Sequence, residues 1–168
     1  MFARSRPLVD EYKYLGTTID NKLKWDRHCS VNYKKCQQRL YCLRKLRSFN
    51  IDNTILSMFY QSCIQSVLTF SFICWFGNVS QKNKNKLQRV VNISSKITGL
   101  KQTSVTPLYE KQVFRKANKI INDSTHILYN EYVLLSSSRR FRTIISKANR
   151  KRDSFMPMYV RLLNDYHL

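Results

Sequence analysis

The sequence predicts a mainly α-helical protein: a short N-terminal β-hairpin, a bundle of about four helices, and a basic, partly ordered C-terminal tail. Three observations lead to this fold class. The 168 residues include only three glycines and three prolines, so little in the chain interrupts helices. Apolar residues recur at helical spacing along much of the chain. Alternation typical of strands occurs in "YKYLGTTI", residues 12–19.

The N-terminal 25 residues are expected to contain the hairpin. Its strands flank Gly16, and a turn follows at "DNK", residues 20–22. Because so few residues precede these strands, we expect the hairpin to be short and poorly covered. We also expect it to lie against the first helix.

A first helix is expected from about residue 27 to residue 47, with Asp26 or Ser30 as its cap. The segment "SFNID" should end this helix. Five residues form an apolar stripe along it: Tyr33, Cys36, Leu40, Leu43 and Leu46.

A second helix should begin near Asn53, with Asp52 or Asn53 as its cap. It runs into "TFSFICWFG", which is expected either to stay helical or to turn extended before Gly77. No charged residue occurs between residues 53 and 81, and this length could span a membrane. Polar residues interrupt the middle of the stretch, so a central core helix is preferred to the transmembrane alternative. These residues are Ser57, Gln61, Ser62, Gln65, Ser66, Thr69 and Ser71.

Two more helices complete the predicted bundle, which occupies residues 26–123. The third begins after Ser80 and ends at Gly99, and the fourth has Thr106 as its cap, Pro107 at its first helical position and an end near Asn122. Residues 124–168 should form a linker with about one helical turn, a basic segment, and a short last helix after Pro157.

The charge balance predicts a polyanionic partner. Thirty lysines and arginines face ten acidic residues, which gives a net charge of +20. No acid lies between Asp52 and Glu110, a stretch that contains six basic residues. Such a field attracts nucleic acid or an anionic membrane surface. The five cysteines form no CxxC motif, so we expect reduced thiols and an intracellular protein, nuclear or cytoplasmic, not a secreted one.

The residues provide no recognisable catalytic constellation. Asp10 and Glu11 are the only adjacent acids and lack a third partner for a two-metal site. None of the three histidines belongs to an HxD motif, and the glycines are isolated. We therefore expect no catalytic residue, no metal, no cofactor and no small-molecule substrate.

Nucleic acid is the predicted partner, with contacts to the backbone phosphates and little sequence preference. Lysine and arginine neutralise phosphates, and interleaved tyrosines such as Tyr41 can stack on bases. The candidate contact residues lie in the first helix and in the basic tail: Lys34, Lys35, Arg39, Arg44, Lys45, Arg139, Arg140 and Arg142.

The order of four segments resembles the C-terminal part of non-LTR (LINE-type) retrotransposon reverse transcriptases. They are "YKYLGTTIDNKLKW", "KKCQQRLYCLRKL", "YQSCIQSVLTFSFICWFGN" and "KLQRVVNISSKITG". The later stretch "SSSRRFRTIISKANRKRDSFMPMYVRLLN" looks like that family's C-terminal end. The similarity covers about residues 9–164.

This resemblance implies a catalytically incomplete fragment. In that family "KYLG" looks like the primer-grip strand pair, the following helices form the thumb, and the catalytic "xADD" motif lies upstream. The family has "HPL" where His126, Ile127 and Leu128 stand, and "LPSG" where "LSSS" stands at residues 135–138. These departures imply a decaying copy, and a non-functional pseudogene product is a further alternative.

Residues 14–46 also resemble a domain named after the N-terminus of an AlkB-type tRNA-modifying protein. The parents of that name are a 2-oxoglutarate-dependent dioxygenase and a tRNA methyltransferase. The name would therefore imply one of these activities, although the sequence has neither an HxD iron site nor a methyl-donor loop.

Overall fold

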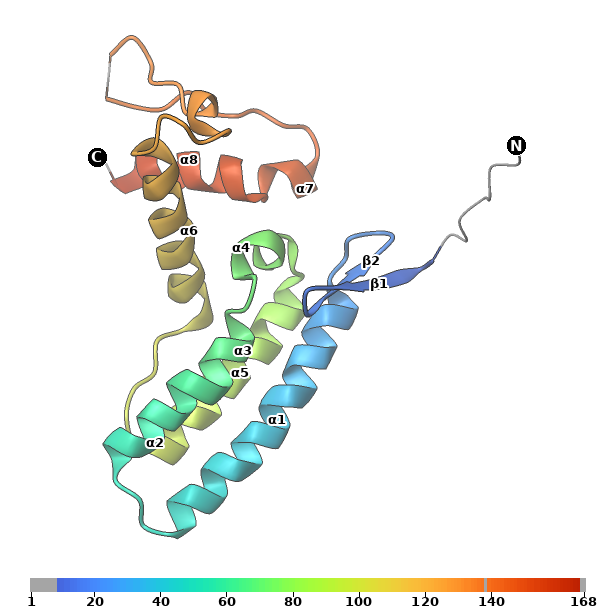
Figure 1. Cartoon of the computed structure of the whole chain (residues 1–168), viewed down its shortest axis with the longest axis vertical. Helices are drawn as coiled ribbons and strands as arrows, with labels where there is room; N and C mark the ends of the chain where they lie inside the picture. Colours follow the sequence, from blue (N-terminus) through green and yellow to red (C-terminus); the bar gives the residue numbers. More distant parts are fainter. Residues whose placement is uncertain (1–8, 138, 167–168) are drawn as a thin grey trace.

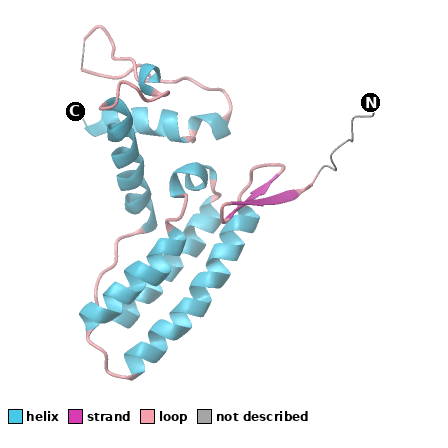
Figure 2. Cartoon of the chain, viewed as in Figure 1, coloured by secondary structure: helices cyan, strands magenta, loops and turns pink. Residues whose placement is uncertain are grey.

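The computed structural model describes residues 9–137 and 139–166 and confirms the mainly helical fold class. Figure 2 shows helices throughout and a strand pair near the N-terminus. Three helical segments lie side by side in the lower part of Figure 1. They are α1 (Asp26–Ser48), the run from α2 (Asn53–Phe59) through η1 (Tyr60–Gln65) to α3 (Ser66–Leu68), and α5 (Gln81–Thr98).

The hairpin pairs β1 (Glu11–Tyr14) with β2 (Thr17–Asp20) in antiparallel register. Leu15 and Gly16 form its two-residue turn with φ values of 44° and 83°. Two consecutive positive φ angles define the type I′ turn that suits the twist of a hairpin, and the second one explains the glycine.

The hairpin lies against α1, as expected. The backbone N–H of Thr18 donates a hydrogen bond to Nδ1 of His28 over 3.2 Å. Thr17, at the start of β2, is buried, whereas β1 is exposed along its whole length. The prediction of a short and poorly covered hairpin is therefore confirmed.

The approach to α1 is organised by Asp20, so the expected caps Asp26 and Ser30 are wrong. Backbone N–H groups of Lys22, Lys24 and Trp25 donate to the Asp20 carboxylate over 2.9 to 3.1 Å. Burial pushes the pKa of Asp20 upward, but these hydrogen bonds outweigh it and hold the pKa below its ordinary value. Trp25 occupies the N-cap position with a left-handed backbone and no side-chain cap.

The bundle core forms where the apolar stripes of the three helical segments meet. Cys36, Leu40 and Leu43 are fully buried on α1, as predicted, while Tyr33 and Leu46 are half-buried. On the facing segments the buried side chains recur every three or four residues. These are Leu56, Tyr60, Ile64 and Leu68 on the second segment and Leu87, Val90 and Val91 on α5.

The second helix differs from its prediction because its backbone changes geometry twice. Residues 60–65 form a π-helix, and the helical run stops at Leu68. Ser71 then takes a left-handed conformation, with φ of 50°, before the short helix α4 (Phe72–Trp75). Asp52 accepts a hydrogen bond from the backbone N–H of Thr54, so this predicted cap is confirmed.

The remaining helices form a second group around an aromatic cluster. Phe72, Trp75 and Phe76 pack with their ring centroids 4.3 to 5.9 Å apart, and the Tyr109 ring lies 5.0 Å from Phe76. The elements of this group are η2 (Phe76–Asn78), α6 (Val105–Ile121), η3 (Tyr129–Glu131), α7 (Asn149–Arg152) and α8 (Phe155–Tyr166).

Helix α6 leads away from the three-helix layer and packs against α8 in the upper part of Figure 1. Two predicted starts are shifted. The N-cap of α6 is Ser104 instead of Thr106, and α8 begins at Phe155, before Pro157. Both shifts leave a proline in a first helical turn, where its missing N–H costs nothing.

No helix in the described ranges is both long enough and apolar enough to cross a lipid bilayer.

Candidate nucleic-acid interface

The five predicted basic residues of α1 point to two different sides of the helix. Arg44 follows Tyr33 by eleven residues, slightly more than three helical turns, so the two share a side. The ammonium of Lys86 on α5 lies 4.6 Å from the centre of the Tyr33 ring, which identifies that side as the one facing α5. Lys34 and Lys45 are also eleven residues apart and lie on the adjoining outer stripe.

Arg39 lies on the opposite side of α1, toward the second helical segment. Its guanidinium donates a hydrogen bond to the backbone carbonyl of Cys63 in the π-helical stretch. Lys35 borders the same side, where both residues line a pocket with Phe70. One donor of the Arg39 guanidinium is therefore used in a hydrogen bond within the protein. Only its remaining donors are left for the predicted phosphate contact.

Helix α5 contributes basic residues that the predicted contact set omitted. Lys82, Arg89 and Lys96 are exposed and follow one another at intervals of seven residues, which places them on one stripe. The exposed Asn85 and Asn92 fill the positions between them. The seven-residue interval was readable in the sequence, but only the packing shows that this stripe runs beside α1.

The two helices run in the same direction. The side-chain amide of Asn83, near the start of α5, donates a hydrogen bond to Asp26 at the start of α1 over 2.6 Å. Figure 1 shows α1 and α5 descending together from this end. Together with the contact between Lys86 and the Tyr33 ring, this places the side of α1 that carries Arg44 next to the basic side of α5.

We call this surface the basic face. Its fourteen-residue stripe on α5 extends about 21 Å, the axial length of about six base pairs. Neither α1 after Asp26 nor α5 contains an acidic residue. The basic face consists of Lys34, Arg44 and Lys45 on α1 and Lys82, Lys86, Arg89 and Lys96 on α5.

Arg139, Arg140 and Arg142 lie far from the basic face. They belong to the segment 139–142, and the loop that contains this segment is drawn above α8, at the end of the molecule opposite the lower end of α1 and α5 in Figure 1. This loop is pinned by a backbone bridge, in which the N–H of Leu135 donates to the carbonyl of Arg140 over 2.8 Å. The structure therefore divides the predicted contact residues between two separate regions.

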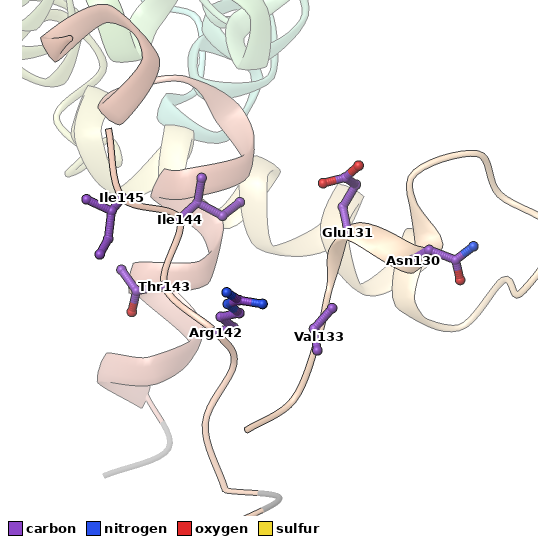
Figure 3. A pocket seen from close by; sticks show the side chains of 7 residues that line it. All are labelled: Asn130, Glu131, Val133, Arg142, Thr143, Ile144 and Ile145. Carbon is purple, nitrogen blue, oxygen red and sulfur yellow. The ribbon is translucent and has the colours of Figure 1, made fainter. Parts of the chain in front are cut away.

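A pocket of about 420 Å³ adjoins Arg142. Figure 3 shows the Arg142 side chain between the chain segments 142–145 and 130–133, with Glu131 on the second segment. The carboxylate of Glu131 weakens the attraction of this pocket for an anion. The basic face, which has no acid within its helices, is the better candidate for phosphate contacts.

Burial shifts the pKa values of His28, Cys29 and Cys36 so that each side chain stays uncharged near neutral pH. Burial raises the pKa of the Cys29 and Cys36 thiols to about 12, so neither is a ready nucleophile. Burial lowers the pKa of His28 to about 4, with a smaller contribution from Lys35. Within residues 9–137 and 139–166, no three His, Cys, Asp or Glu side chains are grouped to hold a metal; His167 lies outside these residues.

The fold and its surface define a class: a small helical module with one long basic face and no metal-ligand cluster among its described residues. A family model for the N-terminal domain of alkylated DNA repair protein alkB homolog 8 matches residues 25–66. The matched segment comprises α1, α2 and η1 and ends at the first residue of α3. No curated protein and no solved structure gives a significant match.

The match supports the predicted AlkB-type resemblance in part. The prediction placed the similarity at residues 14–46, and the family model matches residues 25–66, so the two share residues 25–46. The observed match begins after the hairpin and continues through the π-helix. Nothing in the comparisons supports the resemblance to LINE-type reverse transcriptases.

Proposed function

We propose that the protein binds the phosphate backbone of nucleic acid through the basic face, with little sequence preference. One observation carries this proposal: two parallel helices present lysines and arginines side by side, and neither helix has an acid after Asp26. Such a surface attracts a regular array of phosphates and releases their counterions. The matched family model is named for a protein of alkylated DNA repair, which also points to nucleic acid.

The basic face suits contacts to phosphates better than contacts to base edges. Exposed lysines and arginines at helical intervals can follow a backbone, but sequence readout needs side chains that enter a groove and meet defined bases. We therefore expect similar affinities for duplexes of different sequence. Separate titrations with DNA, RNA and hybrid duplexes measure the preference among backbones.

Replacing one residue on each helix of the basic face should reduce both affinity and salt dependence. Lys34→Gln combined with Arg89→Gln removes two phosphate contacts, so the slope of log K against log salt should fall by about 2. Affinity at about 0.1 M salt should fall roughly 10- to 50-fold. The measurement is fluorescence anisotropy with a labelled primer–template duplex over a salt series.

The matched control is Lys13→Gln combined with Lys147→Gln, which removes the same charge from exposed positions outside the basic face. This variant should keep the wild-type slope. Equal losses in both variants would mean that net charge, and not the basic face, binds the duplex. A wild-type affinity that does not change with salt would refute the proposed function.

The second candidate is the N-terminal domain of an AlkB-type dioxygenase or tRNA methyltransferase, which the family-model match at residues 25–66 favours. Such an enzyme would bind 2-oxoglutarate with iron, or S-adenosylmethionine. Calorimetry with each ligand tests this candidate. Because the described residues contain no group of His, Cys, Asp or Glu that could hold iron, we expect no heat of binding for 2-oxoglutarate with iron. Because the three glycines are isolated and form no methyl-donor loop, we expect none for S-adenosylmethionine.

Descent from a reverse transcriptase thumb is a finer form of the same nucleic-acid-binding proposal. It rests on the order of sequence segments from "YKYLG" to "KLQRVVNISSKITG". It predicts tighter binding to a primer–template junction than to a blunt duplex of equal length. Equal affinities for these two substrates would contradict descent from a thumb domain. They would not contradict phosphate binding by the basic face.

A further inference from the structure

A pocket of about 360 Å³ opens on the side of α1 away from the basic face. It lies where the turn of the hairpin, α1 and α3 meet. Its lining combines a glycine, two cations, two uncharged polar side chains, one aliphatic side chain and an aromatic ring: Gly16, Asn32, Lys35, Arg39, Ser66, Val67 and Phe70.

The aromatic ring of this pocket is held in an exposed position. Phe70 is 48% exposed, although it is a large apolar residue beside the core. Its backbone carbonyl accepts a hydrogen bond from Nε1 of the buried Trp75 over 2.9 Å, and Ser71 after it has a strained left-handed backbone. Backbone strain of this kind persists only where neighbouring contacts impose it.

The turn of the hairpin packs against the same ring. A Cβ atom at Gly16 would lie 3.3 Å from the Phe70 ring, so a larger residue at this position would press on the ring. The Phe70 ring is therefore supported at its edge by Gly16 and fixed at its backbone by Trp75. This arrangement leaves an aromatic surface open beside a pocket.

Two cations of α1 border this aromatic surface. Arg39 is anchored to the Cys63 carbonyl, and the exposed Lys35 lies four residues before it on the same side of the helix. Lys34 belongs to the basic face, and the adjacent Lys35 belongs to the pocket. A nucleic-acid strand that crosses α1 at these two residues would pass from the basic face to the pocket.

We propose that this pocket receives one unstacked nucleotide of a single strand, with the base on the Phe70 ring and its phosphate at Lys35. The inference rests on the proposed function, because the basic face delivers the strand. Stacking on an aromatic ring accepts any base, so no sequence preference is expected here. A base inside a duplex cannot reach the ring, so the pocket should distinguish single strands from duplexes.

The test compares Phe70→Leu with wild type on two probes: a 12-nucleotide single-stranded RNA carrying 2-aminopurine, and a blunt duplex of equal length. Phe70→Leu should weaken single-strand binding about tenfold and abolish the fluorescence change of 2-aminopurine. Duplex affinity should stay within twofold of wild type. Phe70→Trp, unlike Phe70→Leu, should bind the single strand as tightly as wild type does, because tryptophan also has an aromatic ring on which a base can stack.

Phe49→Leu is the matched control, since Phe49 is 72% exposed at the far end of α1 and lies outside the pocket. It should leave both affinities unchanged. Equal effects of Phe70→Leu on both probes, or an equal effect of Phe49→Leu, would overturn the pocket proposal while leaving the basic face in place. Salt-independent binding of both probes by the wild type would instead refute the proposed function, and the pocket proposal with it.

Discussion

Gly77→Ala should destabilise the protein by about 3 kcal/mol, which is at the upper end of the cost of overpacking a core. A Cβ atom at Gly77 would overlap the backbone carbonyl oxygen of Asp153 and would lie 2.8 Å from the Tyr109 hydroxyl. Neither neighbour can move easily, because one is backbone and the other belongs to a buried side chain. Relief requires the segment around Asp153 to move away.

The missing side chain at Gly77 allows the segment between the two C-terminal helices to pack directly against this part of the protein. Asp153 lies between α7 and α8 and forms an ion pair of 3.5 Å with Arg161. Without a side chain at residue 77, the chain from α7 to α8 can rest directly on the end of the aromatic cluster. Urea unfolding followed by circular dichroism measures the cost of the substitution.

Gly99→Ala is the comparison variant for this experiment. Gly99 ends α5 with φ of 69°, so alanine there is strained by its backbone angle and should cost about 1 kcal/mol. Gly77→Ala should also increase proteolysis between residues 139 and 152, whereas Gly99→Ala should not. A Gly77→Ala protein as stable as wild type would show that the C-terminal segment does not rest on residue 77 in solution.

Acidification from pH 7.5 to pH 5.0 should remove about 2 kcal/mol of stability through His28. His28 is 1% exposed, and its Nδ1 accepts the hydrogen bond from the Thr18 N–H. Nε2 of the same ring lies 2.9 Å from the side-chain amide nitrogen of Asn32. A second proton would remove the acceptor that holds the hairpin and would place a charge among buried rings.

The direction of this effect follows from the lowered pKa. The His28 pKa is about 4 in the folded state against 6.5 as the ordinary value. Above pH 6.5 both folded and unfolded states carry a neutral ring, so the full stability is present. Between pH 6.5 and 4 the unfolded state takes up the proton first, and stability falls by about 3 kcal/mol over the whole interval.

His28→Gln removes the titration, so its stability should change little between pH 7.5 and 5.0, although it starts from a lower value. His126→Gln alters the other described histidine and should keep the wild-type pH profile. Urea unfolding at several pH values provides the comparison. A wild-type profile that stays flat down to pH 5 would contradict the buried, neutral state of His28.

Much of the fold followed from local sequence features. The alternation around Gly16 predicted the hairpin, and the start of the third helix after Ser80 and its end at Gly99 were placed correctly. The stripe through Cys36, Leu40 and Leu43 predicted the buried side of α1. Such features succeed because turn chemistry and helical periodicity act within a few residues.

The second helix shows where local reasoning ends. Its nearly continuous apolar composition predicted one core helix, whereas the structure contains a π-helical stretch and a break before Phe72. The exposed Ile55 and Met58 also show that one side of this helix stays uncovered. Apolar composition alone does not decide which side is buried, because that depends on the neighbouring helices.

The candidate site divides in the same way. The sequence by itself determined that the protein is strongly basic, mainly helical, and free of acids after Asp26 in α1 and throughout α5. Only the tertiary structure decided which cations lie near one another. It placed the side of α1 that carries Arg44 beside α5, turned Arg39 toward Cys63, and put the segment 139–142 at the other end of the molecule. The physical reason is that charge belongs to single residues, whereas a binding surface depends on which helices pack side by side and in which register.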